Sequence, residues 1–268
     1  MIISYTTEDY FDWSLIFVKS FCYLHPDVKV HINSRNLKDQ QIDKIKSVGS
    51  NIFVDNKKLS IKDLAEKYNI KEKDIENSRK GNNDKKKHDH RLWMNLTADG
   101  DRISQYYETV NQYPNEDYYL LCDIDLLFRK SLYDFFEEIK QYDVGLKLRV
   151  NKKSNILPDK INVSNPDSRD AKINIGTVFI NNNFDGLKFL KDWSEINEQL
   201  PIIDQHKTKK AQYSIALTYN SLDMNYKKIS PMIFDPELRE QSNVWFFKSK
   251  KKDMMLDIAE KERRKICK

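Results

Sequence analysis

The chain of 268 residues is long enough for one sizeable α/β domain with its own core, or for two small ones. Hydrophobic residues make up 39% and aromatic residues 12% of the sequence, a composition that excludes a disordered chain. The 46 basic and 41 acidic residues leave a net charge of +5, which fits anionic substrates or solubility better than a nucleic-acid surface. We therefore predict a single domain over residues 1–268 with no nucleic-acid partner.

The cysteines and the apolar runs bear on the compartment of the protein. The three cysteines are widely spaced and form no CxxC pair, which argues against a zinc site or a redox couple and indicates a reduced setting. The first residues lack the pattern of a signal peptide, and no apolar run nears the roughly 18 residues that a membrane span needs. The expected location is cytoplasmic, without an integral membrane segment.

The first part of the chain alternates between strand and helix patterns. A short apolar run at 2–5, stopped by polar residues, predicts a buried strand. A helix follows and ends before Pro26. Its apolar face is formed by Phe11, Leu15, Val18 and Cys22 and is widened by Ser14, Phe17, Phe21 and Leu24. The next predicted elements are a strand at 28–32, a helix at 37–48 and a strand at 51–54. This order is typical of a parallel sheet covered by helices, in which ligands bind at the carboxyl ends of the strands.

The rest of the chain continues the same alternation after a polar, charged stretch at 57–90. Proline, glycine, asparagine and serine clusters mark the predicted loops at 77–90 and 151–170. Helical spacing is found at 61–68, 102–112, 131–142, 184–200 and 204–219, and strand patterns at 118–129, 144–150, 171–182 and near Tyr226 and Val244. A charged helix is expected at the C-terminal end.

Two carboxylates end the most apolar of the predicted strands. The run YYLLC leads directly into Asp123-Ile124-Asp125. Residues i and i+2 of a strand point to the same side, so both carboxylates would crowd at the strand end, where a cation between them relieves their repulsion. Mg²⁺ or Mn²⁺ accepts one or two carboxylates and fills its other positions with water and substrate phosphates, which indicates a diphosphate ligand. The alternative is that the two residues begin a solvated turn.

Three motifs together resemble those of GT-A glycosyltransferases. YYLLCDIDLLFRKSL is similar to the DxD strand of that fold, and most similar to that of the glycogenin and lipopolysaccharide galactosyltransferase group, glycosyltransferase family eight. NIGTVFINN, at 174–182, is similar to the N-x-G strand of the group, and Asp204-Gln205 is similar to its DQ element. The three motifs in this order cover about half of the chain and are more specific together than a DxD alone.

The resemblance implies a fold and a reaction. The fold would be α/β, a GT-A, Rossmann-like mixed sheet flanked by helices, in a single GT-A domain with a charged C-terminal helix at about 252–266. The reaction would transfer a sugar from a nucleoside-diphosphate sugar, expected to be a UDP-sugar, to a saccharide or another hydroxyl acceptor. The group retains anomeric configuration, so retention is implied, with Mn²⁺ or Mg²⁺ as the cofactor.

The resemblance also implies roles for individual residues. Asp123 and Asp125 would hold the metal and the hydroxyls of the sugar or ribose, while Tyr5 and Thr6 would lie beside the base and ribose. Gly176 would allow close backbone approach in the sugar pocket. The expected catalytic set is Asn174 in the sugar pocket together with Asp204 and Gln205 near the anomeric carbon.

One segment departs from the pattern of the group. The HxxGxxK segment of the group supplies a histidine as a further metal ligand, whereas Phe246 stands in its place here and only Lys252 matches. His206 is a candidate replacement ligand. Lys248, with its neighbours at 250 and 251, could neutralise a departing diphosphate or form a solvated basic tail.

Two arginines before the DxD strand, Arg91 and Arg102, are candidates for contacting the phosphates, although either could be a surface residue. His88 and His90 lie among lysines, which favours a solvated segment over a metal site. Trp93, Trp193 and Trp245 could stack on a sugar or base, but large aromatic residues at helical or strand spacing are more often part of the core.

Two other functions compete with sugar transfer. A sugar nucleotidyltransferase also uses paired carboxylates and a metal, but the first strand is not followed by a glycine-rich phosphate loop. A non-catalytic basic binding protein would use the lysine clusters, but the acidic residues are dispersed among them and no known binding module is visible. The sequence leaves the acceptor and the oligomeric state open.

Overall fold

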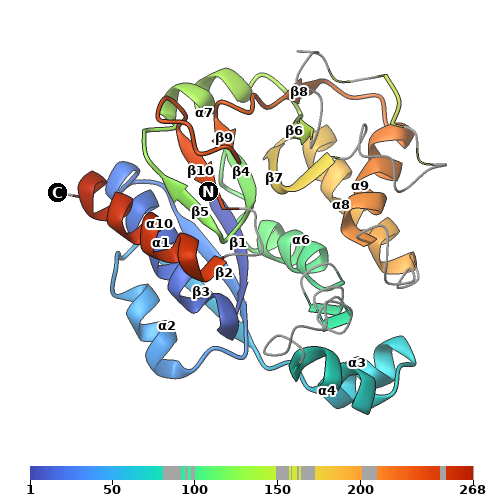
Figure 1. The fold of residues 1–268 in the computed structure, drawn as a ribbon. Coiled ribbons are helices and arrows are strands. Elements are labelled where there is room, and N and C mark those ends of the chain that lie inside the picture. Colours follow the sequence, from blue (N-terminus) through green and yellow to red (C-terminus); the bar gives the residue numbers. More distant parts are fainter. Residues whose placement is uncertain are drawn as a thin grey trace.

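The computed structural model of the protein describes most of the chain (Figure 1). The described residues are 1–80, 92–93, 96–97, 100–148, 157, 159–161, 163, 173–200, 210–247 and 252–267, without the side chains of 80 and 252–255. None of the helices in these segments is long and apolar enough to cross a membrane.

A mixed β-sheet forms the centre of the described structure. Its strand order is β3-β2-β1-β4-β7-β6-β8, and β7 runs antiparallel to both of its neighbours while the other pairs are parallel. The strands are β1 (Ile2–Thr7), β2 (Val30–Arg35), β3 (Ile52–Lys57), β4 (Tyr118–Asp123), β6 (Val144–Leu148), β7 (Ile173–Asn181) and β8 (Tyr226–Lys228). The carboxyl ends of β1, β2 and β4 therefore meet at one edge of the sheet.

Helices cover both faces of this sheet (Figure 1). Because side chains alternate along a strand, Ile2 joins the apolar cluster under α1 and Ile3 joins the cluster under the helices on the other face. α1 (Phe11–Leu24) and α10 (Lys252–Ile266) lie on the first face, and α6 (Arg102–Gln112), α8 (Phe184–Gln199) and α9 (Lys210–Ser221) lie on the second. Each strand thus separates two apolar cores.

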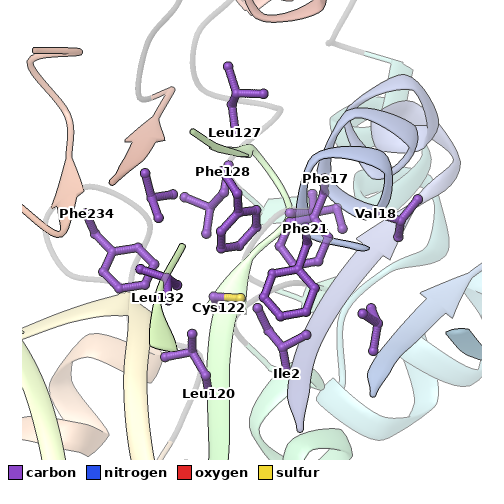
Figure 2. Close-up of a cluster of buried hydrophobic side chains, with 14 of the residues drawn as sticks. Ile2, Phe17, Val18, Phe21, Leu120, Cys122, Leu127, Phe128, Leu132 and Phe234 are labelled. Atoms are coloured by element: carbon purple, nitrogen blue, oxygen red, sulfur yellow. The ribbon is translucent and has the colours of Figure 1, made fainter. Parts of the chain in front are cut away.

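The buried face of α1 centres on residues that widen the predicted apolar face. Phe17, Val18 and Phe21 are fully buried, whereas Phe11, predicted to lie on the apolar face, is only partly buried. Figure 2 shows the rings of Phe17 and Phe21 directed at Phe128 and at the first strand. The aromatic rings define the face because they remove the largest apolar area from water.

A second, small sheet takes up the end of the predicted strand at 118–129. That prediction of one continuous strand is wrong, because the chain bends after Asp123 and leaves the main sheet. The three strands of the small sheet are β5 (Leu126–Phe128), β9 (Phe234–Asp235) and β10 (Val244–Phe246). All three residues of β5 are fully buried in the core beside α1, so the apolar pattern continues through the bend although the pairing partner changes.

The remaining elements agree with the sequence in kind and differ at their ends, except for helix α4 (Glu72–Lys80), which was not predicted. β2 and β3 extend further into polar residues than predicted, because pairing with neighbouring strands satisfies their backbone groups. Helix α4 covers 77–80, where a loop was predicted, since Ile75 anchors it in a small apolar cluster with Leu64 and Trp93. The elements not yet described are a short 3₁₀ turn at Glu8–Tyr10 and the helices α2 (Asp39–Lys46), α3 (Ile61–Tyr68) and α7 (Tyr133–Ile139).

The buried side chain of His25 connects the end of α1 to the start of α7. Its Nε2 accepts a hydrogen bond from the Leu132 amide at 2.8 Å, and its Nδ1 lies 3.2 Å from the Phe21 carbonyl. An amide can only donate, so His25 is neutral and carries its proton on Nδ1. Burial lowers the pKa of His25 from 6.5 to about 4.

This pKa predicts an acid-dependent loss of stability. Below pH 6.5 the unfolded chain binds a proton at His25 that the folded chain does not bind until about pH 4, so stability falls as the pH falls through this window. We expect the His25 contribution to drop by about 2 kcal/mol between pH 7 and pH 5. Urea unfolding at the two pH values measures it, with His25→Gln, which keeps an acceptor without a titrating ring, as the control. An equal pH dependence in that variant would contradict the assignment.

Candidate functional site

Asp123 ends β4 at the edge where three parallel strands finish. Tyr5 of β1 is its direct neighbour in the ladder, and Asn33 of β2 follows next across the sheet. The Asp123 side chain is 25% exposed, so its charge is neither buried nor in bulk water. This is the edge at which ligands bind in open α/β sheets.

Gly176 of β7 lies against the Asp123 carboxylate. A Cβ atom added at Gly176 would lie 2.2 Å from Asp123 Oδ2 and 2.8 Å from Phe246 Cζ. These distances are too short for any side chain, so glycine is required for close approach. The two named atoms therefore lie within about 5 Å of each other, which brings the Phe246 ring to the site.

The side chain of Arg102, at the start of α6, meets the same carboxylate. Arg102 Nη1 lies 2.5 Å from Asp123 Oδ1, and the arginine side chain is only 7% exposed. A charged hydrogen bond to a poorly solvated partner is among the stronger polar contacts in proteins. Of the two arginines predicted to reach the phosphates, Arg102 is therefore at the site, while Arg91 lies outside the described residues.

Asp125 lies in the bend after β4 and is not part of a strand. The expectation that Asp125 belongs to the strand is therefore wrong, and strand alternation does not decide where its carboxylate points. Its main-chain oxygen accepts a hydrogen bond from the Phe247 amide at 3.1 Å, which ties the bend to the end of β10. The residue is 6% exposed.

Two buried polar groups at this edge have no hydrogen-bond partner in the described part of the structure. They are the hydroxyl of Tyr5 and the side-chain nitrogen of Asn174. The oxygen of the Asn174 side chain accepts from the Gly176 amide at 3.1 Å, which fixes the orientation of the nitrogen. Burial raises the pKa of Tyr5, so its hydroxyl keeps its proton. Both groups can donate to a ligand.

Thr6 points away from this group of residues. Its hydroxyl lies 2.9 Å from that of Ser14 on α1, so it faces the opposite side of the sheet from Tyr5. The place of Thr6 beside the base and ribose stays a prediction, and its side chain is not directed at Asp123. The reason is strand alternation, which puts neighbouring residues on opposite faces.

The sequence did not single out the ion pair between Arg35 and Asp101. Arg35 ends β2, and its Nε donates to Asp101 Oδ2 at 2.7 Å. Asp101 directly precedes Arg102. The strand-end rule that selected Asp123 applies equally to β2, so the position of Arg35 was an available signal.

Several predicted residues lie outside the described part of the chain. These are Asp204, Gln205, His206, Arg91 and Lys248, together with His88 and His90. Lys252 begins α10, but its side chain is not described. The tryptophans at 93, 193 and 245 are buried, as expected for core residues.

The carboxylates of Asp123 and Asp125 are the acidic groups of the site that could contribute oxygen ligands to a metal. Within the described residues there is no group of three or more histidine, cysteine or acidic side chains that could hold a metal. Asp123 and Asp125 alone would leave most positions to water and phosphate oxygens, which is the usual arrangement for Mg²⁺ and related ions. The aromatic side chain of Phe246, which replaces the expected histidine, cannot ligate.

The structure is similar to solved glycosyltransferases along almost its whole length. The galactosyltransferase LgtC, determined with donor and acceptor sugar analogues, superposes with a TM-score of 0.57 at 14% identity, covering 99% of this chain and 96% of that one. The glycosyltransferase GlyE from Streptococcus pneumoniae TIGR4 gives a TM-score of 0.56 at 12% identity, covering 98% and 60%. The bifunctional glycosyltransferase WbbM gives 0.54 at 7% identity, covering 98% and 49%.

The sequence itself has no comparable match. No protein-family model and no curated protein matches it. At these low sequence identities, the structural similarity shows the fold alone. The predicted fold is confirmed: the chain has the mixed α/β fold of the GT-A glycosyltransferases.

Proposed function

We propose that the protein is a metal-dependent glycosyltransferase that moves a sugar from a nucleoside-diphosphate sugar to a hydroxyl acceptor. The observation that carries the proposal is Asp123. Its carboxylate ends a buried strand of a GT-A fold, contacts Arg102 and packs against Gly176. Arg102 is the positive partner of this charge in the structure, and the metal of a sugar nucleotide would add a second positive charge at the same edge.

Asp123 and Asp125 are the residues that would hold the metal. A bound Mn²⁺ or Mg²⁺ acts as a Lewis acid that stabilises the negative charge on the departing diphosphate. Arg102 pairs with Asp123 and would add its charge to the same phosphates. Lys248 and Lys252 remain candidates for the same role.

The neutral groups of the site would orient the donor. The unpaired donors of Asn174 and Tyr5 suit the hydroxyls of a sugar or ribose, since each would otherwise stay buried without a partner. Asp204 and Gln205 are proposed near the anomeric carbon, on the strength of their motif. Retention of configuration and a uridine base are proposed from the same resemblance.

A sugar nucleotidyltransferase is the enzyme that competes with this proposal. In the structure, β1 leads through the turn at Glu8–Tyr10 directly into α1, and none of these residues is a glycine. A loop that binds a nucleoside triphosphate through its backbone usually needs glycine to let the phosphates approach. The absence of glycine there favours transfer of a sugar.

The proposal predicts ligand-dependent thermal stability. UDP and Mn²⁺ together should raise the melting temperature by on the order of 5 °C when both are well above their dissociation constants, and neither should do so alone. Asp125→Asn keeps the size of the side chain but removes its charge, so it should fold and lose this shift. Asp223→Asn, at an exposed position between α9 and β8, is the matched control and should keep the shift. A full shift in Asp125→Asn would overturn the assignment of Asp125.

Gly176→Ala should disturb the site through packing alone. The added methyl group displaces the Asp123 carboxylate, because the nearest atom belongs to a short side chain held by Arg102. We expect a loss of about 1 to 3 kcal/mol in the free energy of unfolding together with loss of the UDP and Mn²⁺ response. Urea unfolding and thermal shift measure the two effects.

Gly49→Ala provides the comparison for this variant. The nearest atom to an added Cβ there is Asn51 Oδ1 at 2.7 Å, in a side chain that donates to the Val28 carbonyl, so some stability should be lost. The UDP and Mn²⁺ response should remain, because neither residue is at the Asp123 site. Equal behaviour of the two variants would show that the contact between Gly176 and Asp123 has no special role.

A further inference from the structure

Arg35 forms a buried ion pair with Asp101, the residue that directly precedes Arg102. Its Nε and Nη2 both donate to Asp101 Oδ2, the first at 2.7 Å, and its Nη1 donates to the Ser34 carbonyl at 3.0 Å. The Arg35 side chain is 3% exposed and the Asp101 side chain 18%. The guanidinium also lies 5.7 Å from the centre of the Tyr5 ring. These contacts hold Arg35 in one orientation.

Asp101 occupies the N-cap position of α6 but does not cap the helix. Aspartate is among the best N-cap residues, because its carboxylate accepts hydrogen bonds from free amides of the first turn. Here Asp101 has helical backbone angles and makes no such side-chain bond. Its carboxylate is directed to Arg35 instead, so helix capping does not account for it.

The two consecutive residues Asp101 and Arg102 reach strands on opposite sides of β1. Asp101 binds Arg35 at the end of β2, and Arg102 binds Asp123 at the end of β4. In the sheet, β1 lies between β2 and β4. The start of α6 is therefore attached to the carboxyl edge of the sheet at two points.

We propose that Arg35 is a positioning residue for the donor site, which acts through Asp101 to hold Arg102 at the place where the diphosphate binds. The inference rests on the proposed function. An arginine that binds phosphate must be held in one geometry before the ligand arrives, because ordering a long side chain on binding costs affinity. The ion pair between Arg35 and Asp101 would restrict the orientation of Arg102 from outside the ligand site, because Asp101 directly precedes Arg102 in the chain.

A second arginine offers a matched control. Arg129 is also a largely buried arginine, 13% exposed in its side chain, that pairs with a carboxylate, Glu262, and lies over an aromatic ring, that of Trp245. The pair between Arg129 and Glu262 connects the small sheet to α10. Arg129→Met and Arg35→Met therefore remove similar contacts, but only the second removes a contact next to Arg102.

The experiment measures the dissociation constant of UDP by calorimetry in the presence of Mn²⁺. Arg35→Met should weaken UDP binding about tenfold, the order expected when one charged hydrogen bond is misaligned, while Arg129→Met leaves it unchanged. Arg35→Lys should recover part of the loss because it keeps the charge. If Arg35→Met does not fold, the double variant Arg35→Met with Asp101→Asn removes both charges and should show the same tenfold loss.

A variant of Arg102 tests whether Arg35 acts through it. In an Arg102→Met background, Arg35→Met should cause no further loss of UDP affinity, because the residue it positions is gone. A further tenfold loss there, or unchanged binding in the single Arg35→Met variant, would overturn the inference. A wild-type protein that does not bind UDP or GDP with Mn²⁺ would instead overturn the proposed function, and this inference with it.

Discussion

The negative charge of Asp123 is the constraint around which the site is built. A carboxylate at the end of a buried strand is poorly solvated, so it needs a positive partner at close range. In the described structure this partner is Arg102, at 2.5 Å. A divalent cation and a diphosphate would bring further charges of both signs to the same edge. The start of α6 is therefore a structural element and a proposed part of the binding site at once.

Packing restricts this arrangement as strongly as charge does. Gly176 leaves no room for a side chain between β7 and the Asp123 carboxylate, and the Phe246 ring closes the same space from the small sheet. Phe246 also stands where the sequence resemblance implied a histidine. A metal at this site would depend on water and ligand phosphates for its remaining positions, which ties metal binding to nucleotide binding.

The bend after β4 connects the site to the core beneath it. The main-chain oxygen of Asp125 accepts from the Phe247 amide, and the following residues enter the small sheet. The rings of Phe17 and Phe21 pack against Phe128 just below (Figure 2). The position of Asp125 is thus set by a core of aromatic side chains, which is rigid because such cores are densely packed.

The sequence by itself determined the order of strands and helices, the apolar strand before Asp123 and the GT-A fold, because hydrophobic periodicity and short motifs are local properties. It did not determine the bend at Asp125, since an apolar run looks the same whether one sheet or two receive it. Nor did it show that Arg102 meets Asp123, or that Arg35 binds Asp101, because these partners are 21 and 66 residues apart. Such pairs form only when the sheet brings the ends of separate strands together, so the tertiary structure alone decided them.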